Sequence, residues 1–293
     1  IGIGGAGMSA LARYYKHLGV EVKGYDKTAT SLTERLISEG IAINFEDSIE
    51  SIPSNIREAK NLLLVITPAI PESNKQLQEL ITKGHRPRKR AEVLGEIIAG
   101  VKSIAIAGTH GKTSTTALLA HIMDGTNEGC NAFLGGISAC NNSNLYYKQS
   151  AEWTIVEADE FDKSFHHLYP TYGLITSLDP DHLDIYGDEE SFIKAFEKFS
   201  GQIKNPPLIA KNVEWNYGEY ERYGIKSCGD EVVKLDHYAS KIIATTTGID
   251  CEIHLDNEAE IIKDISFSML GKHNIENMIG AAALAHRAGV SRE

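Results

Sequence analysis

The stretch that most constrains the fold of this chain is SIAIAGTHGKTSTT, residues 103–116. Five strand-forming residues lead into a tight Gly-Thr-His-Gly turn, which is followed by Lys112 and a row of hydroxyl side chains. A strand, a glycine turn and a helix in this order form a cradle for phosphate groups. The strict P-loop pattern G-x-x-x-x-G-K-[ST] fails, because Ile106 stands where its first glycine belongs. The stretch therefore indicates either a nucleotide site with a shortened loop or a chance cluster of turn residues.

Short apolar runs alternate with longer helical patterns along the chain, which predicts a parallel α/β fold. Strands are expected at 21–25, 61–66, 103–107, 153–156 and 172–175, and helices at about 112–123, 191–199 and 273–288. We expect a Rossmann-like parallel-sheet domain over residues 1–99 and a P-loop-type α/β domain over residues 100–293. The patterns give no assignment for residues 124–149 or 212–240.

A second glycine-rich turn, GIGGAGM, opens the chain and satisfies G-x-G-x-x-G with Gly2, Gly4 and Gly7. Such glycines allow a tight strand-to-helix turn and let backbone amides approach a diphosphate. Asp26 ends the next expected strand, where a dinucleotide fold places its ribose ligand. The turn indicates NAD(P), another nucleotide that carries a diphosphate, or a glycine turn needed only for close packing.

Acidic residues follow the apolar strand WTIV, as Glu157-Ala158-Asp159-Glu160. The carboxyl ends of neighbouring parallel strands lie at one edge of the sheet, so these acids are expected beside the phosphate loop. Lys112 would meet the β- and γ-phosphates of a nucleotide, and the Thr113 hydroxyl would bind Mg²⁺. Because Mg²⁺ prefers oxygen ligands, the acidic turn suits a metal–nucleotide site, although a solvated acidic turn is the simpler alternative.

The stretch LDPDHLDIYG supplies a histidine between acids after the next apolar strand. His182 is flanked by Asp181 and Asp184, and we expect it at a second metal ion.

Composition limits the class of protein. The net charge of -11 over 293 residues argues against a nucleic-acid partner, which requires a basic face. Four cysteines show no C-x-x-C spacing, as is usual for free thiols in a reducing compartment. No apolar run has the length of a membrane span and no signal-peptide pattern occurs, so no membrane partner and a cytoplasmic location are expected. The opening at Ile1, directly on a glycine turn, leads us to expect a short preceding segment.

Taken together, these stretches resemble the Mur ligase family, the ATP-dependent enzymes that assemble the stem peptide of peptidoglycan. The resemblance spans nearly the whole chain, in the segments IGIGGAGMSALA, TPAIPESN, KRAEVLGEI, AGTHGKTSTT, VEADEFDKSF, DPDHLDIYG and GKHNIENMIGAAALA. Mur ligases carry a shortened GTxGK[TS] loop, which accounts for the glycine missing at position 106.

The resemblance implies a role for each matching position. Gly4, Gly5 and Gly7 would hold the diphosphate of a UDP-sugar, with Asp26 on its ribose or uracil side. The ATP contacts would be Gly108, Thr109, His110, Gly111, Lys112, Thr113, Ser114, Asn274 and Asn277. Thr113 and Glu157 would hold a first Mg²⁺ and His182 a second. Lys112, Glu157 and His182 would be catalytic, and His110 is also a candidate contact for the muramyl substrate.

The implied reaction is ATP-dependent ligation of L-alanine to UDP-N-acetylmuramate through an acyl phosphate. Three alternatives stay open: ligation of a recycled tripeptide to the same sugar nucleotide, an NAD-dependent oxidoreductase, and a nucleotide-binding regulator without catalysis. Mur ligases also have a third domain, so the resemblance implies a chain that lacks the C-terminal ligase domain and does not turn over alone. The sequence does not indicate the oligomeric state.

Overall fold

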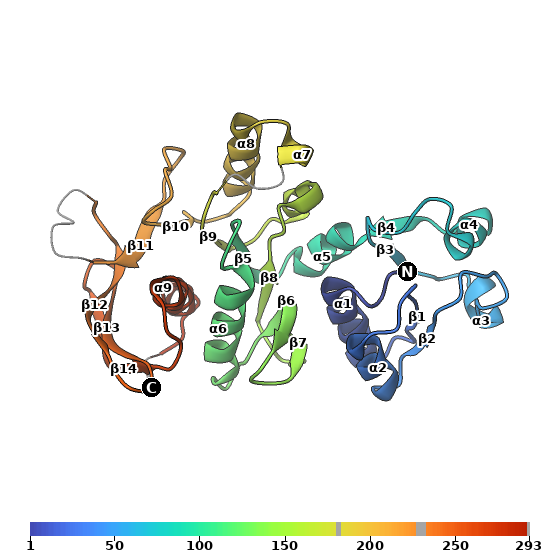
Figure 1. Cartoon of the computed structure of the whole chain (residues 1–293), viewed down its shortest axis with the longest axis horizontal. Helices are drawn as coiled ribbons and strands as arrows, with labels where there is room; N and C mark the ends of the chain where they lie inside the picture. The colour runs from blue at the N-terminus through green and yellow to red at the C-terminus, as the bar shows by residue number, and fades with distance from the viewer. Residues whose placement is uncertain (180–182, 227–232, 292–293) are drawn as a thin grey trace. The chain divides into compact units, whose positions relative to one another are not determined.

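The computed structural model describes residues 1–179, 183–226 and 233–291. The chain divides into two compact units (Figure 1). The first unit contains Ile1–Ile97 together with Phe133–Tyr147, and the second contains Ile98–Ala132 and Lys148–Glu293. The first division lies close to the boundary expected near residue 99. The return of Phe133–Tyr147 to the first unit has no counterpart in the sequence patterns.

The first unit alternates helices with short strands. Its elements up to the division are α1 (Ala6–His17), β1 (Lys23–Tyr25), α2 (Ser31–Ser38), β2 (Ala42–Asn44), α3 (Ser54–Arg57), β3 (Leu64–Ile66), α4 (Lys75–Thr82), β4 (Pro87–Lys89) and α5 (Arg90–Ile98). β1 pairs with β2 and β3 with β4, both in parallel, as the α/β pattern predicts. The strand β4 was not expected in its basic, proline-containing stretch. Pro87 is tolerated because it stands first in the strand.

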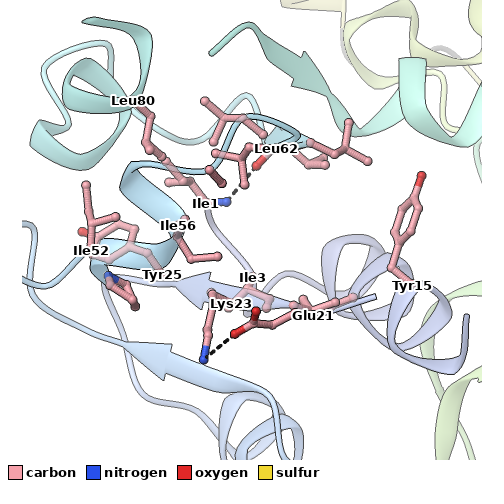
Figure 2. Close-up of a pocket in the computed structure, with 18 of the residues that line it drawn as sticks. Ile1, Ile3, Tyr15, Glu21, Lys23, Tyr25, Ile52, Ile56, Leu62 and Leu80 are labelled. Atoms are coloured by element: carbon pink, nitrogen blue, oxygen red, sulfur yellow. Dashed lines mark hydrogen bonds and ion pairs between the residues drawn. The ribbon is translucent and has the colours of Figure 1, made fainter. Parts of the chain in front are cut away.

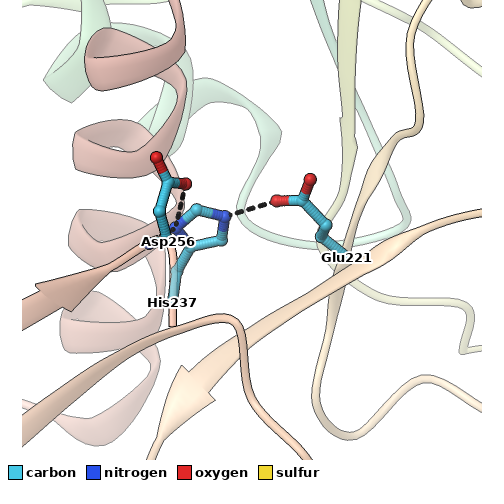
Figure 3. A group of neighbouring side chains, drawn as sticks. All are labelled: Glu221, His237 and Asp256. Atoms are coloured by element: carbon cyan, nitrogen blue, oxygen red, sulfur yellow. Dashed lines mark hydrogen bonds and ion pairs between the residues drawn. The ribbon is translucent and has the colours of Figure 1, made fainter. Parts of the chain in front are cut away.

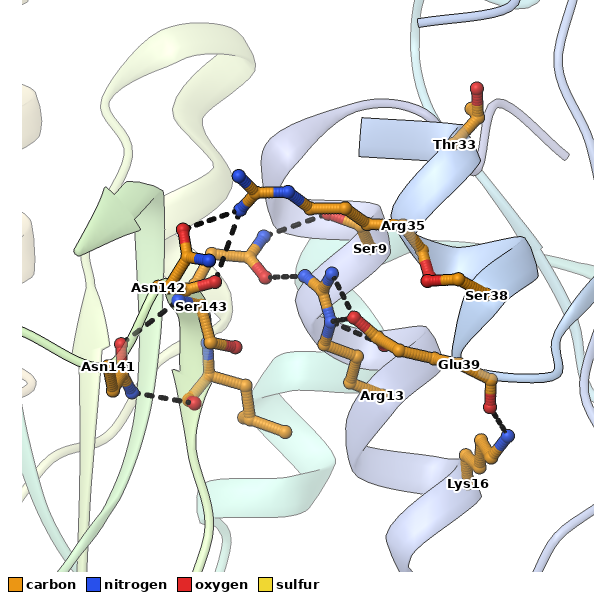
Figure 4. A network of polar contacts seen from close by, with 12 residues as sticks. Ser9, Arg13, Lys16, Thr33, Arg35, Ser38, Glu39, Asn141, Asn142 and Ser143 are labelled. Atoms are coloured by element: carbon orange, nitrogen blue, oxygen red, sulfur yellow. Dashed lines mark hydrogen bonds and ion pairs between the residues drawn. The ribbon is translucent and has the colours of Figure 1, made fainter. Parts of the chain in front are cut away.

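A hairpin of β6 (Asn131–Ser138) and β7 (Ser143–Tyr146) occupies part of the stretch that the sequence left unassigned. From Phe133 onward it belongs to the first unit, where β7 lies against α1. The fully buried Asn144 of β7 donates to Ala6 O at 2.5 Å and to Ser9 Oγ at 2.8 Å, and its Oδ1 accepts from the Arg13 guanidinium (Figure 4). Arg13 also binds Glu39 through two nitrogens. This network joins the hairpin to the first turn of α1.

Replacing Asn144 with Leu is expected to lower the free energy of unfolding by about 2 kcal/mol, because buried donors and acceptors lose their partner. Urea denaturation measures the change. Asn55→Leu is the matched control, since Asn55 is exposed and its amide only reaches Glu21 at 3.3 Å. Equal losses in the two variants would show that the buried network adds no stability.

The second unit is built on one sheet. Its elements are β5 (Lys102–Ala107), α6 (Lys112–Asp124), β8 (Trp153–Glu157), the 3-10 helix η1 (Phe161–His167), β9 (Tyr172–Ile175), α7 (Leu183–Tyr186), α8 (Glu189–Ser200), β10 (Leu208–Ala210), β11 (Glu221–Ile225), β12 (His237–Ala244), β13 (Ile249–Leu255), β14 (Glu260–Phe267) and α9 (Lys272–Arg287). The strands lie in the order β14-β13-β12-β11-β10-β9-β5-β8. The pairs from β8 to β12 are parallel, which confirms the expected architecture. β13 and β14 are antiparallel, which the sequence patterns did not predict.

Two long helices, α8 and α9, pack against other elements of the second unit. In α8 the buried side chains Phe192, Phe196 and Phe199 recur at helical spacing, and Phe196 and Phe199 pack on Phe165 of η1. α9 packs against α6 and against strands β10–β13 (Figure 1). In the described part of the chain, no helix has the length and apolar character needed to cross a membrane.

Candidate functional site

The phosphate-type loop connects β5 to α6, as the sequence predicted. Gly108 has φ +129° and Gly111, the residue before α6, has φ +83°, conformations that L side chains rarely adopt. Thr176 and Ser177, which directly follow β9, hold this loop by hydrogen bonds. Thr109 Oγ1 lies 2.8 Å from Ser177 Oγ, and the His110 backbone N–H donates to the same oxygen at 2.8 Å. Thr176 Oγ1 donates to Ala107 O at 3.1 Å.

Lys112 is the first residue of α6, and its ammonium faces the acidic turn after β8. Its Nζ lies 2.7 Å from Glu160 Oε2, in an ion pair whose side chains are 17% and 3% exposed. The sequence indicates Glu160 only as one acid among several. A buried carboxylate of this kind needs a paired cation, so Glu160 holds the Lys112 ammonium at the loop in this structure.

Thr113 Oγ1 donates to Glu157 Oε2 at 3.0 Å. The structure therefore brings together the two residues that the sequence assigned to the first Mg²⁺. A hydroxyl oxygen and a carboxylate oxygen are hard ligands of the type Mg²⁺ prefers, so this pair fits the metal.

Of the other residues predicted to contact ATP, some lie against the loop and others do not. A Cβ atom built on Gly111 would come within 2.7 Å of Asn277 Oδ1, so Asn277 of α9 lies directly against the loop. Asn274 instead donates its side-chain amide to Leu270 O at 2.7 Å, within its own helix-start turn. His110 is exposed, with its Nε2 3.9 Å from Asp179 Oδ2. Ser114 follows Thr113 in the first turn of α6.

The proposed second metal residue is not described by the structure. His182 and Asp181 lie outside the described residues, as does the side chain of Asp184. Their assignment stays a prediction.

The N-terminal glycine loop folds as a turn followed by the helix α1. Asp26 turns its carboxylate into this loop, where Oδ2 accepts the Gly4 backbone N–H at 2.7 Å. The first backbone amides of α1 have no partner within the helix, which leaves them available to an anion. A Cβ built on Gly7 would come within 2.6 Å of Arg90 Nη1, so a guanidinium side chain lies against the loop. The sequence reasoning missed Arg90, although it stands in the quoted KRAEVLGEI segment.

A cavity of about 530 Å³ lies in the first unit between β1 and β3 (Figure 2). Aliphatic side chains, among them Ile3, Ile52 and Leu80, line most of it, and the Ile1 nitrogen donates to Val65 O at 2.7 Å. Because its lining is largely apolar, this cavity does not suit a diphosphate, which needs amides or cations.

A cluster of His237 with Glu221 and Asp256 resembles a metal site by its residue types (Figure 3). The buried His237 Nε2 lies 2.7 Å from Glu221 Oε2, while Nδ1 accepts the Asp256 backbone N–H at 3.3 Å. Arg287 Nη2 also lies 2.5 Å from Glu221 Oε2. Both ring nitrogens and the carboxylate are thus engaged within the chain, so we interpret the cluster as a structural link between the sheet and α9.

The hydrogen bond from His237, assisted by Arg287, lowers the pKa of Glu221 from 4.5 to about 2. A carboxyl with a depressed pKa in the folded state adds stability above pH 4.5, and this stability is lost as the pH falls from 4.5 toward 2. The Glu221 side chain is 36% exposed, so solvent screening reduces its contribution to about 1 kcal/mol.

Glu221→Gln is therefore expected to be less stable than the native chain at pH 6, with a difference that shrinks toward pH 3. Urea denaturation across this range measures it. Glu152→Gln, at an exposed pair with Lys102, controls for the general effect of losing one carboxylate. A Glu221→Gln difference that stays constant with pH would contradict the assigned pKa.

Comparison with known proteins places the chain in a family context. A sequence profile of the Mur ligase middle domain matches residues 106–285, and one described as Mur ligase family, catalytic domain, matches residues 1–102. A UDP-N-acetylmuramate–L-alanine ligase of Porphyromonas gingivalis strain W83 is 40% identical over 100% of this chain, and one of Flavobacterium johnsoniae is 42% identical over 99%. These matches cover 64% and 62% of the two relatives, so the chain spans less than two thirds of their length.

Comparison with solved structures also finds proteins with a similar fold. The UDP-N-acetylmuramate-alanine ligase of Thermotoga maritima matches with a TM-score of 0.83 and 25% identity, over 98% of this chain and 64% of that one. The UDP-N-acetylmuramate:L-alanyl-gamma-D-glutamyl-meso-diaminopimelate ligase of Neisseria meningitides matches with a TM-score of 0.80 over 100% and 93% of the two chains. Its 21% identity shows a shared fold alone.

Proposed function

The chain belongs to the Mur ligase family, and on that premise we propose that the protein joins L-alanine to UDP-N-acetylmuramate and converts ATP to ADP and phosphate in the same reaction. The observation that carries the proposal is the constellation at the start of α6. Lys112 and Thr113 meet Glu160 and Glu157 there, beside a glycine loop held by β9. A cation, a hydroxyl and paired carboxylates at one sheet edge are the groups that a metal–triphosphate site requires.

The chemistry explains why a triphosphate is needed. A carboxylate is a poor electrophile, and oxide is a poor leaving group. Transfer of the γ-phosphoryl group to the lactyl carboxylate gives ADP and an acyl phosphate. The amine of L-alanine then attacks the acyl carbon, the C–O bond to phosphate breaks, and the nitrogen loses a proton. In the first step two anions approach one another, and the Lys112 ammonium offsets their repulsion.

Enzymes of this family use ATP and Mg²⁺ generally. In this chain we assign Thr113 and Glu157 to the first ion, because their oxygens already lie within 3.0 Å of one another. When bound, Mg²⁺ would neutralise charge on the phosphate oxygens. The hydrogen bond between Thr113 and Glu157 fixes the two oxygens that would bind the ion. The backbone amides of the loop direct the phosphate chain toward Lys112.

We assign the UDP-sugar to the N-terminal glycine loop. The available amides at the start of α1 and the guanidinium of Arg90 beside Gly7 favour a diphosphate there. Asp26 already accepts the Gly4 amide, so this loop offers the diphosphate the amides that follow Gly5.

A cytoplasmic location of the protein stays a prediction.

Calorimetric titration tests the substrate assignment. The chain is titrated with UDP-N-acetylmuramate, UDP-N-acetylglucosamine and NAD. Binding of the muramyl compound without binding of NAD is the expected result. Binding of NAD alone would overturn the assignment and favour an oxidoreductase.

The amino acid is tested with the whole protein by following ADP release in the presence of UDP-N-acetylmuramate. L-alanine is expected to support turnover, whereas the tripeptide L-Ala-γ-D-Glu-meso-diaminopimelate is not. Turnover with the tripeptide alone would replace the proposed acceptor and keep the ligase chemistry.

A further inference from the structure

The three ammonium protons of Lys112 already have acceptors inside the chain. Nζ lies 2.6 Å from Gly108 O, 2.9 Å from Glu160 Oε1 and 2.7 Å from Glu160 Oε2. A lysine ammonium has three donors and no acceptor capacity. A phosphate oxygen that approaches Lys112 must therefore replace one of these bonds.

The backbone of Glu160 is fixed in place through its carbonyl oxygen. Its carbonyl oxygen accepts the Tyr186 hydroxyl at 2.6 Å and the Lys163 backbone N–H at 3.0 Å. Its side chain is 3% exposed, so Lys112 rather than water compensates the charge of the carboxylate. The pair is therefore held by geometry as well as by charge.

We propose that Glu160 is a positioning residue that holds the Lys112 ammonium in the nucleotide-free loop and competes with the β- and γ-phosphates for it. The inference rests on the proposed ATP-dependent function. Glu160 acts through Lys112: it occupies the donors that the phosphates need, and its negative charge opposes theirs. It keeps the ammonium within the loop and lowers the affinity for the triphosphate.

The neutral, isosteric variant Glu160→Gln tests the competition. Its amide oxygen still accepts one bond from Lys112, but the opposing charge is removed. The dissociation constant for MgATP, measured by calorimetry, is expected to fall about fivefold, a shift that corresponds to about 1 kcal/mol of contact energy. The affinity for AMP is expected to stay constant, because AMP has no β- or γ-phosphate to reach Lys112.

Glu152→Gln is the matched control, because Glu152, just before β8, pairs at 2.6 Å with Lys102 at the start of β5, which is the end of these strands opposite to the phosphate loop. It is expected to leave the affinity for MgATP unchanged. Circular dichroism shows whether each variant folds. If Glu160→Gln does not fold, Glu160→Asp retains the charge but shortens its reach, and MgATP affinity is expected to rise two- to threefold, by about half of that contact energy.

The outcomes separate this inference from the proposed function. Native protein that binds no MgATP overturns both. Native protein that binds MgATP, with a folded Glu160→Gln variant that binds it equally or more weakly, overturns the competition alone. A gain for AMP equal to the gain for MgATP also contradicts it, because the change would not act through the terminal phosphates.

Discussion

Replacing Lys112 with Met is expected to lower the rate of ATP-dependent ligation about a thousandfold, the cost of removing one charged group that stabilises a transferring phosphoryl. Met fills a similar volume without the ammonium. The rate of ADP release in the whole protein, at saturating concentrations of all three substrates, measures the effect. Lys102→Met is the matched control: Lys102 lies in β5, is exposed and pairs with Glu152, and this variant is expected to keep the native rate.

The Lys112→Met variant also leaves the buried Glu160 carboxylate without its cation, which is expected to cost about 3 to 5 kcal/mol of stability. The double variant Lys112→Met/Glu160→Gln removes both charges. It is expected to regain most of the stability without regaining activity. A double variant that recovers the native rate would show that Lys112 serves only to neutralise Glu160.

Replacing Gly108 with Ala is expected to lower the free energy of unfolding by about 3 kcal/mol and to abolish nucleotide binding. Its φ of +129° is strained for any L side chain. A Cβ atom there would also come within 2.9 Å of Ser177 N and 3.0 Å of Ser177 O, which are backbone atoms with little freedom to move. The loop must then separate from the end of β9. Urea denaturation and calorimetry with MgATP measure the two effects.

Gly100→Ala separates backbone strain from crowding. Gly100 has φ +78°, but a Cβ built there meets no atom within 4 Å. Its replacement is expected to cost about 1 kcal/mol and to leave nucleotide binding intact. If both glycine variants lose the same stability, the contact between Gly108 and Ser177 does not constrain the loop.

Local sequence patterns were sufficient to predict several strands and helices of the second unit. The strand at 103–107 and the helix at 112–123 appear as β5 and α6 within one residue at each end. The aromatic repeat of 191–199 lies within α8. These elements could be predicted because burial against a sheet imposes a period on the sequence. The expectation that an acid directly after the 153–156 run reaches the loop is also confirmed: Glu157, the last residue of β8, accepts a hydrogen bond from the Thr113 hydroxyl.

Other features depend on contacts between distant segments. Within Glu157-Ala158-Asp159-Glu160 the sequence could not show which acid meets Lys112, because that depends on how the chain turns after β8. Thr176 and Ser177 also looked like ordinary residues after a strand. One available signal was overlooked: apolar and polar residues alternate along IDCEIHL, residues 249–255, as is typical of an antiparallel strand, and β13 buries the apolar ones.

Residue period, backbone freedom and charge over a few neighbouring residues were enough to predict the strands and helices around the phosphate loop, the two glycine loops and the chemical types at the phosphate edge. The pairing of Glu160 with Lys112, the contact of the residues after β9 with the loop and the return of the β6–β7 hairpin to α1 appear only in the folded chain. These pairings join residues tens of positions apart, and their energy comes from burial and hydrogen bonds that exist only once the chain has folded.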